Sequence, residues 1–172
     1  MRKSRHNEDE TRNDLAGEHR WGDAGQIILA FSFAAVWILD SSIFRYTTFL
    51  NSSVPVIVRV PLAAILFVLA GYFAWTGLFI VFHQVREQPS VIRKGVFGLV
   101  RHPIYLGEIL LYLGFLALNI SLAAAFVWIL SIGFLHYFSR HEERLLLAKF
   151  GEEYRQYMRE VPMWIPRLRR KS

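Results

Sequence analysis

Cysteine is absent from this chain of 172 residues. A disulfide, a thiolate nucleophile and a cysteine metal ligand are therefore excluded, and cysteine usage does not indicate the redox compartment. Histidine does not take over the metal-binding role, because His83, His136 and His141 have no ligand-forming partners at the spacings that metal sites use. We expect no bound metal.

Two further patterns are missing. No Gly-x-Gly-x-x-Gly segment follows a strand-like run, so a soluble dinucleotide-binding domain is not indicated. The first twenty residues are polar and of mixed charge, and they lack the apolar segment and small-residue cleavage site of a signal peptide. We expect residues 1–22 to form a disordered cytosolic tail and residues 23–172 to form a single membrane domain.

Apolar residues, in contrast, are abundant. They make up 53% of the chain, whose mean hydropathy is +0.28, and they gather in runs near residues 24–39, 60–82, 104–118 and 122–138. A membrane span needs about 20 residues, or about 17 at the short end. The first and third runs are shorter than the others. If the first run spans the membrane, it extends toward Phe44. The alternative for the first and third runs is a half-inserted or tilted helix. The predicted fold class is an all-α integral membrane bundle of about four transmembrane helices.

Basic residues predict the orientation of this bundle. The net charge is +6, and the basic residues flank apolar runs, which favours a lipid bilayer as partner and argues against nucleic acid. Between the first and second runs lie only Arg45 and Arg59, while the other eighteen lysines and arginines lie before the first run, between the second and third, or after the fourth. The positive-inside rule then places both termini in the cytosol, and Asp40 and Arg59 at the outer interface.

The segment after the fourth run has a different pattern. Apolar residues recur at steps of three and four from Leu146 to Val161, with charged residues between them, which predicts an amphipathic cytosolic helix. We expect a bend near Gly151 and an end at Pro162. This helix either lies on the membrane surface or folds back as a lid over the hairpin that the third and fourth runs form.

Two motifs place polar side chains at the mouth of that hairpin. They are GVFGLVRHPIYLG at residues 95–107 and HEERLLLAKFGEEYRQYMREVPMWIP at residues 141–166. Adjacent helical positions point about 100° apart, so we expect one of Glu142 and Glu143 to face solvent. Glu108 lies inside the third run, where an ionisable group is costly; it is functional, reaches the interface, or pairs with Arg101. The motifs suggest a site that brings a water-soluble cofactor to a membrane substrate.

In this order the two motifs resemble the integral-membrane methyltransferases, which include isoprenylcysteine carboxyl methyltransferases and phospholipid N-methyltransferases. The resemblance covers residues 83–166. It implies S-adenosylmethionine as cofactor and a lipophilic or membrane-associated acceptor: an isoprenylcysteine carboxylate, a phospholipid amine, or a small thiol or lipid. The cofactor-binding residues that it implies are Phe97, Arg101, His102, Pro103, Ile104, Tyr105 and Glu142. The catalytic residues that it implies are Arg140, Glu142 and Glu143.

One position departs from this family. The prenylcysteine enzymes carry an arginine four residues before the first motif glutamate, where it receives the substrate carboxylate. Here that position holds Phe138, and the nearest arginine is Arg140. The difference argues against a prenylcysteine carboxylate as substrate. We expect the acceptor to enter from the bilayer, along an apolar side of the hairpin formed by Leu106, Leu110, Phe134 and Leu135.

Two other functions stay open. NADPH-dependent membrane sterol reductases carry a similar His-Pro-x-Tyr-x-Gly segment, but they usually follow it with an Asp-x-x-Arg-Cys-type segment, whereas this chain has Glu142-Glu143-Arg144-Leu145. The third possibility is a non-catalytic membrane scaffold that keeps the same fold. Cofactor binding distinguishes the methyltransferase from the reductase. Substitution of His102 and Glu142 tests the scaffold, whose function these changes would leave intact.

Overall fold

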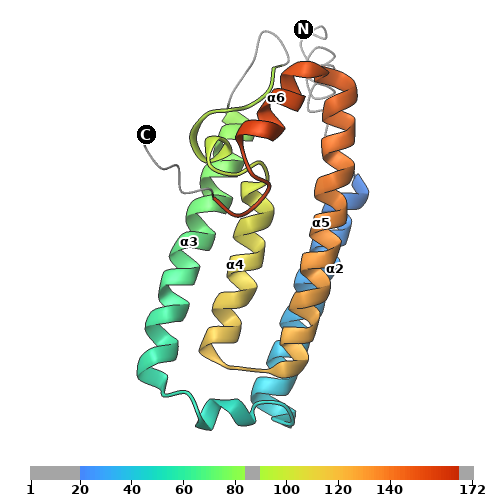
Figure 1. Ribbon diagram of the computed structural model, residues 1–172. Helices are drawn as coiled ribbons and strands as arrows, with labels where there is room; N and C mark the ends of the chain where they lie inside the picture. Colours follow the sequence, from blue (N-terminus) through green and yellow to red (C-terminus); the bar gives the residue numbers. More distant parts are fainter. Residues whose placement is uncertain (1–19, 84–89, 167–172) are drawn as a thin grey trace, which may run out of the picture.

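The computed structural model describes residues 20–83 and 90–166, and over these ranges the chain is helical, without strands (Figure 1). The predicted tail lies outside the described residues as far as residue 19. The α-helices are α2 (Arg20–Ile38), α3 (Val56–His83), α4 (Pro103–Leu118), α5 (Leu122–Phe150) and α6 (Glu152–Glu160). Shorter turns are the π-helix η1 (Leu39–Phe44) and the 3-10 helices η2 (Phe49–Ser52) and η3 (Gly95–Gly98). The predicted all-α fold class is confirmed.

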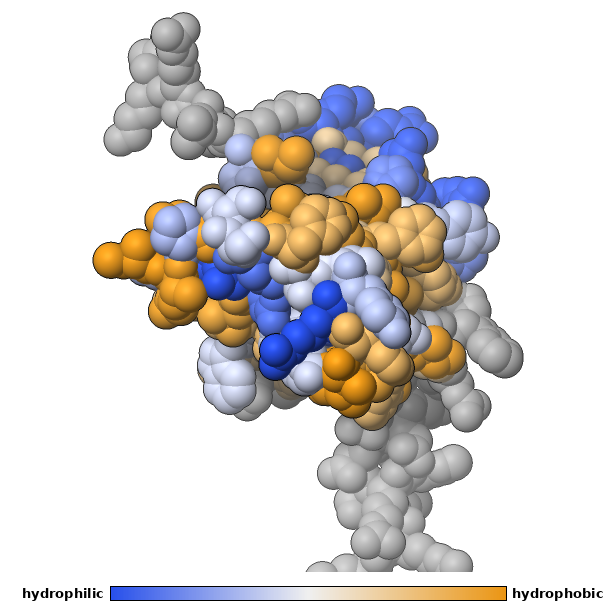
Figure 2. Space-filling model, turned by 90° about the horizontal axis from the view of Figure 1, so that it is seen from below, coloured by the Kyte–Doolittle hydropathy of each residue, from blue (hydrophilic) through white to orange (hydrophobic). Residues whose placement is uncertain are grey.

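Three helical segments are long and apolar enough to cross a membrane: Ala24–Phe44, Val56–Phe82 and Leu122–Phe150. The apolar helix α4 has 16 residues and falls short of that length. Large apolar side chains such as Phe31, Val68 and Trp75 are more than 70% exposed, which suits a surface whose solvent is lipid. Apolar side chains also cover much of the face seen in Figure 2, around a smaller polar area. The chain is an integral membrane protein.

The bundle consists of two closely packed helix pairs. α3 packs along α4, and α2 packs along α5 (Figure 1). Small residues allow the first pair to approach closely: a Cβ atom at Gly107 would lie 3.0 Å from the carbonyl oxygen of Ala70, and one at Gly114 would lie 2.6 Å from the ring of Phe67. Such small-residue contacts replace the hydrophobic driving force that is missing between helices in lipid.

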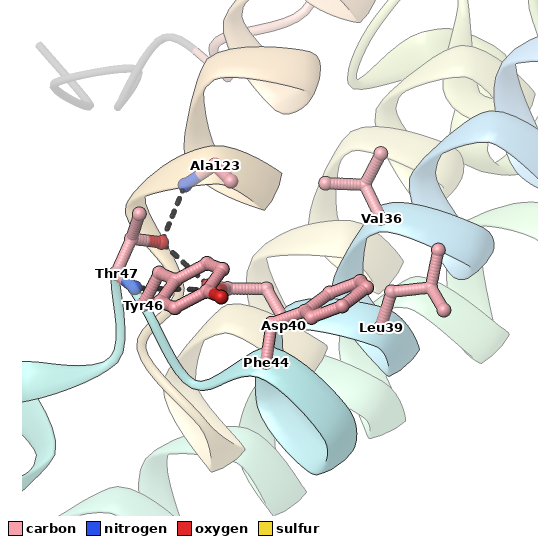
Figure 3. Close-up of a pocket in the computed structure, with 7 residues that line it drawn as sticks. All are labelled: Val36, Leu39, Asp40, Phe44, Tyr46, Thr47 and Ala123. Atoms are coloured by element: carbon pink, nitrogen blue, oxygen red, sulfur yellow. Dashed lines mark hydrogen bonds between the residues drawn. The ribbon is translucent and has the colours of Figure 1, made fainter.

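The connection between α2 and α3 closes one end of the bundle, which we call the loop end. Asp40 there is only 6% exposed, although the sequence placed it at the interface. Its carboxylate accepts hydrogen bonds from Thr47 N at 3.1 Å, Thr47 Oγ1 at 2.5 Å and Ser121 Oγ at 2.5 Å, beside a cavity of about 260 Å³ (Figure 3). Burial is tolerated because these donors satisfy the carboxylate. They tie α2 to the turn between α4 and α5.

At the other end, which we call the α6 end, helix α5 continues twelve residues past the predicted limit of Phe138 and stops at Phe150. The chain reverses at Gly151, whose φ of +57° favours glycine, and α6 then runs back over the start of α4 (Figure 1). Tyr154, Tyr157 and Val161 of this fold-back are buried against the end of α5 and Val91. Of the two predicted placements for the amphipathic helix, the structure therefore shows the fold-back over the hairpin.

Candidate functional site at the α6 end

Five predicted residues meet where α4 begins and α5 leaves the bundle. We call them the polar cluster: Arg101, His102, Tyr105, Glu142 and Glu143. The imidazole is its centre, because His102 precedes the first turn of α4 and Pro103 fixes that turn. Nδ1 of His102 lies 3.4 Å from Glu142 Oε2, and Nε2 lies 3.4 Å from Glu143 Oε1. The ring of Tyr105 stacks against the imidazole, and its hydroxyl donates to Glu142 Oε1.

The expectation that one glutamate faces solvent is wrong. The side chain of Glu143 is 2% exposed and that of Glu142 is 20% exposed, and both point toward His102. Consecutive helical positions do diverge by about 100°, but the two nitrogens of an imidazole lie on different edges of the ring and reach both carboxylates. Two acidic side chains therefore converge on one histidine.

Arg101 is occupied within the protein. Its side chain is 8% exposed, and it donates to Glu143 Oε1 from Nε at 2.8 Å and from a terminal nitrogen at 2.7 Å. The other terminal nitrogen donates to the carbonyl oxygens of Met158 at 2.9 Å and Val161 at 2.6 Å. The guanidinium therefore holds the end of α6 against α5. Glu108 does not pair with Arg101: it accepts a hydrogen bond from Tyr112 at 2.5 Å.

The other predicted site residues lie around the polar cluster, most of them facing away from it. Pro103 and Ile104 pack against α3, where a Cβ at Gly77 would lie 3.3 Å and 2.9 Å from them. Phe97 packs against the cluster of Phe73, Val96 and Val100. Arg140 is 61% exposed and lies 3.6 Å from Glu143 Oε2.

The residues of the predicted apolar entry path lie in different surroundings, and the path itself stays a prediction. Leu135 is completely buried, and Leu106 and Leu110 pack against the same cluster as Phe97, on the α3 side of α4. Leu106 and Leu110 remain partly exposed, whereas Leu135 does not. The reason is that α4 uses one face for α3 and another for α5, so apolar character alone does not separate lipid-facing from helix-facing positions.

Charge and burial act against each other at His102. Burial lowers the pKa of the imidazole, but hydrogen bonds and charge from Glu142 and Glu143 outweigh it, so the pKa lies above its ordinary value. The imidazolium form is therefore favoured. When His102 is protonated the polar cluster is neutral, with two cations and two carboxylates, and loss of that proton leaves it anionic.

The sequence did not assign Tyr154 and Tyr157 to the site, although their spacing placed them on the apolar face of α6. Tyr157 donates to the carbonyl oxygen of Phe97 at 2.7 Å, and both tyrosines are at most 3% exposed. Burial raises the pKa of both phenols above the ordinary value, so they remain neutral. The bond from Tyr157 joins α6 to η3, and both rings pack against the end of α5.

Comparison with known proteins gives one curated relative. The chain is 33% identical over 95 residues to "Cobalt-zinc-cadmium resistance protein CzcN" of Cupriavidus metallidurans. That match covers 55% of this chain and 42% of the relative, so the chain spans less than half of the relative's length. No solved structure matches.

A family profile described as "Protein of unknown function (DUF1295)" matches residues 1–161. The expectation that the chain belongs to the isoprenylcysteine carboxyl and phospholipid N-methyltransferases is therefore wrong. The structure offers a physical reason, because Pro103 and Gly107 of the shared motif serve to start α4 and to pack it on α3. Those tasks are common to membrane helical folds of different chemistry. The chain is a membrane protein of the DUF1295 family.

Proposed function

We propose that this protein is a membrane enzyme that binds S-adenosylmethionine at the polar cluster and transfers its methyl group to a lipophilic acceptor. The observation that carries the proposal is the convergence of two carboxylates on His102 at the end of an apolar bundle. In the transfer, a bond forms between a heteroatom of the acceptor and the methyl carbon, the carbon–sulfur bond breaks, S-adenosylhomocysteine leaves, and the proton of the acceptor group passes to Glu142. The support comes from the chemistry of the site and not from family membership.

The charges of the cluster suit a cation that can replace a proton. Arg101 already neutralises Glu143. Glu142 is the more exposed acid, and its partners are His102 and the hydroxyl of Tyr105. A ligand with an ammonium or sulfonium group binds next to Glu142 most favourably when His102 has lost its proton, because both cations compete for one carboxylate. The face of Tyr105 adds a favourable contact for a sulfonium.

The arrangement also separates an aqueous side from an apolar side. α6 and the segment after it cover the cluster from outside the bundle, held by Arg101 and by the bond from Tyr157 to Phe97. Inside the bundle the cluster adjoins the apolar contact of Tyr105, Ile109 and Leu135. A charged cofactor that arrives from the cytosol and a lipophile that arrives from the bilayer would meet at the cluster. Entry of the cofactor requires α6 to move.

A second candidate is an NADPH-dependent reductase, because the membrane sterol reductases carry a His-Pro-x-Tyr-x-Gly segment like the one that begins at His102. The two candidates differ in the charge of the cofactor. S-Adenosylmethionine carries a net positive charge at neutral pH, whereas NADPH carries several negative charges on its phosphates. The proton on His102 opposes the binding of S-adenosylmethionine and assists the binding of NADPH. The pH dependence of binding therefore has opposite signs for the two cofactors.

The test is calorimetry of the purified protein in detergent with S-adenosylmethionine, S-adenosylhomocysteine and NADPH. We expect S-adenosylmethionine to bind, with an affinity that rises with pH by up to about tenfold per pH unit below the raised pKa of His102. Glu142→Gln should weaken binding by about 1–3 kcal/mol, the usual loss for a buried polar partner, whereas His102→Ala removes the competing proton and should abolish the pH dependence of binding. Glu152→Gln is the matched control, because Glu152 lies exposed on α6, where it pairs with Arg155 and Arg159 and not with the polar cluster.

Each result decides between the candidates. Binding of NADPH that tightens as the pH falls, without binding of S-adenosylmethionine, would establish the reductase and refute methyl transfer. Binding of neither cofactor by a folded protein would refute both and favour the scaffold. If S-adenosylmethionine binds, incubation of its methyl-labelled form with membrane lipid extract should yield a labelled lipophilic product.

A further inference from the structure

One face of α5 carries polar side chains into the interior of the bundle. Ser131, Leu135, Ser139 and Glu143 follow one another at steps of four residues, and each is at most 2% exposed. Residues at this spacing lie on the same side of a helix. Two serines and a glutamate are thus fully enclosed along a single line, and Glu143 at its end belongs to the polar cluster.

The two serines differ in their hydrogen bonds. Ser131 Oγ donates to the carbonyl oxygen of Val127 at 2.9 Å, which is the common solution for a serine buried in a helix. Ser139 Oγ, one helical step closer to the polar cluster, makes no hydrogen bond although its residue is 0% exposed. Buried hydroxyl groups in folded proteins are nearly always paired. Ser139 is therefore unusual in the same helix that satisfies Ser131.

Two more enclosed atoms at the α6 end are also without a hydrogen bond. They are Glu143 Oε2, whose nearest ion partner is Arg140 at 3.6 Å, and Trp164 Nε1. Trp164 follows α6 and packs against the cluster of Tyr105, Ile109 and Leu135, and its ring lies 5.6 Å from that of His136. Within the described residues, only Ser41 at the loop end shares this property. Three of the four such atoms therefore belong to the α6 end.

We propose that Ser139, Trp164 and the free oxygen of Glu143 form a subsite for the polar group of the lipophilic substrate, and that this group is a neutral hydroxyl. The subsite rests on the proposed function, because it adjoins the polar cluster and names the class of acceptor that the cluster would serve. Ser139 and Trp164 are positioning residues for that acceptor.

The chemistry of the three atoms selects the ligand. An indole N–H only donates, an ionised carboxylate only accepts, and a serine hydroxyl does both. A ligand that satisfies all three must accept from Trp164 and donate to Glu143. A hydroxyl group meets both requirements with one oxygen. A carboxylate on the ligand would instead be repelled by Glu143, and a hydrocarbon would leave every one of the three atoms unpaired.

The experiment measures binding of three probes of equal chain length: 1-dodecanol, dodecanoate and dodecane. Thermal unfolding of the purified full chain in detergent reports their binding as a rise of the midpoint. We expect 1-dodecanol to bind the wild-type protein more tightly than the other two. Ser139→Ala and Trp164→Phe should each weaken the binding of 1-dodecanol by about tenfold, because one buried hydrogen bond is lost. Neither substitution should change the binding of dodecane.

Ser131→Ala is the matched control, since this serine is equally buried on the same face of α5 but bonds to its own helix. It should bind 1-dodecanol as the wild type does. Without a probe, the Ser139→Ala protein should be as stable as the wild type, because it loses no hydrogen bond. That result confirms that weaker binding is not a folding defect.

Three outcomes would overturn the subsite. The first is equal binding of 1-dodecanol and dodecane, which would show unspecific partition. The second is equal affinity of the Ser139→Ala and Ser131→Ala proteins for 1-dodecanol, as expected if a buried water pairs with Ser139. The third is tighter binding of dodecanoate. Failure of the proposed function is distinguishable from failure of the subsite. If the wild-type protein binds 1-dodecanol as described but binds neither cofactor, the subsite stands and only the proposed methyl transfer is refuted.

Discussion

His102 shows how much of the site depends on a single side chain. The sequence predicted its place at the start of a helix because proline follows it, and Pro103 does begin α4. The sequence did not predict that both Glu142 and Glu143 would reach it. That outcome depends on where α5 crosses the start of α4, which is a property of packing and is not encoded in the spacing of the two glutamates. The partners of Arg101, which include two backbone carbonyls, were unpredictable for the same reason.

At this scale we predict a pH-dependent stability with a defined sign. The pKa of His102 is raised in the folded protein. Folding is therefore coupled to uptake of a proton at pH values between the unfolded pKa, about 6.5, and the higher folded pKa. The stabilisation is complete below the unfolded value and is lost as the pH rises through the folded one, with a slope of at most about 1.4 kcal/mol per pH unit. Thermal midpoints of the wild type should fall over this window.

His102→Gln is the comparison for that experiment, because it cannot take up a proton. As the pH rises above about 6.5, its thermal midpoint should change less than that of the wild type. An identical slope in both proteins would mean that other groups cause the effect, and the raised pKa of His102 would have no measurable role in folding.

Among the elements, α5 shows that a helix can continue beyond the end of its apolar run, and α6 follows where that helix stops. The fourth apolar run ends near Phe138, but α5 continues to Phe150, because HEERLLLAK contains good helix formers that need no lipid around them. Loss of hydropathy indicates where the bilayer ends and does not indicate where the helix ends. The bend at Gly151 was predictable, since a glycine between two periodic segments is a common helix stop.

A substitution at this bend tests whether α6 needs its fold-back. Gly151 has φ +57° and ψ −124°, and no atom lies within 4 Å of a Cβ placed there, so backbone strain alone opposes a side chain. Gly151→Ala should destabilise the α6 contact by about 1–3 kcal/mol. Trypsin should then cleave faster after Arg155 and Arg159.

The control for that experiment is Gly133→Ala. Gly133 lies inside α5, and a Cβ there also meets no atom within 4 Å. Because its backbone is helical, alanine should be neutral or stabilise α5 by up to about 1 kcal/mol. Equal cleavage of both variants would show that the positive φ at Gly151 is not what keeps α6 in place.

For the whole molecule, the sequence predicted the class and the hairpin but not the pairing of helices. The turn Asn119–Ser121 between α4 and α5 forced an antiparallel hairpin, yet α4 packs most closely on α3 and α5 packs on α2. The signal for that choice is the glycines Gly77, Gly107 and Gly114, whose missing side chains make room for α3 and α4 to meet. A one-dimensional pattern of apolar residues does not show which neighbour will fill that room.

Topology is the prediction that belongs to the whole molecule. Eighteen of the twenty lysines and arginines flank the α6 end in sequence, and only Arg45 and Arg59 belong to the loop end. Arg59 is moreover occupied there, because it donates to Asn51 Oδ1 at 2.6 Å and to the carbonyl oxygen of Leu118 at 2.8 Å. The positive-inside rule therefore places the α6 end and the polar cluster in the cytosol. Reporter fusions at Ser172 should read as cytosolic, whereas a reporter inserted after Ser53 should read as external. The reverse pattern would place the polar cluster outside the cell membrane, away from cytosolic S-adenosylmethionine and NADPH, and would count against both proposed enzymes at once.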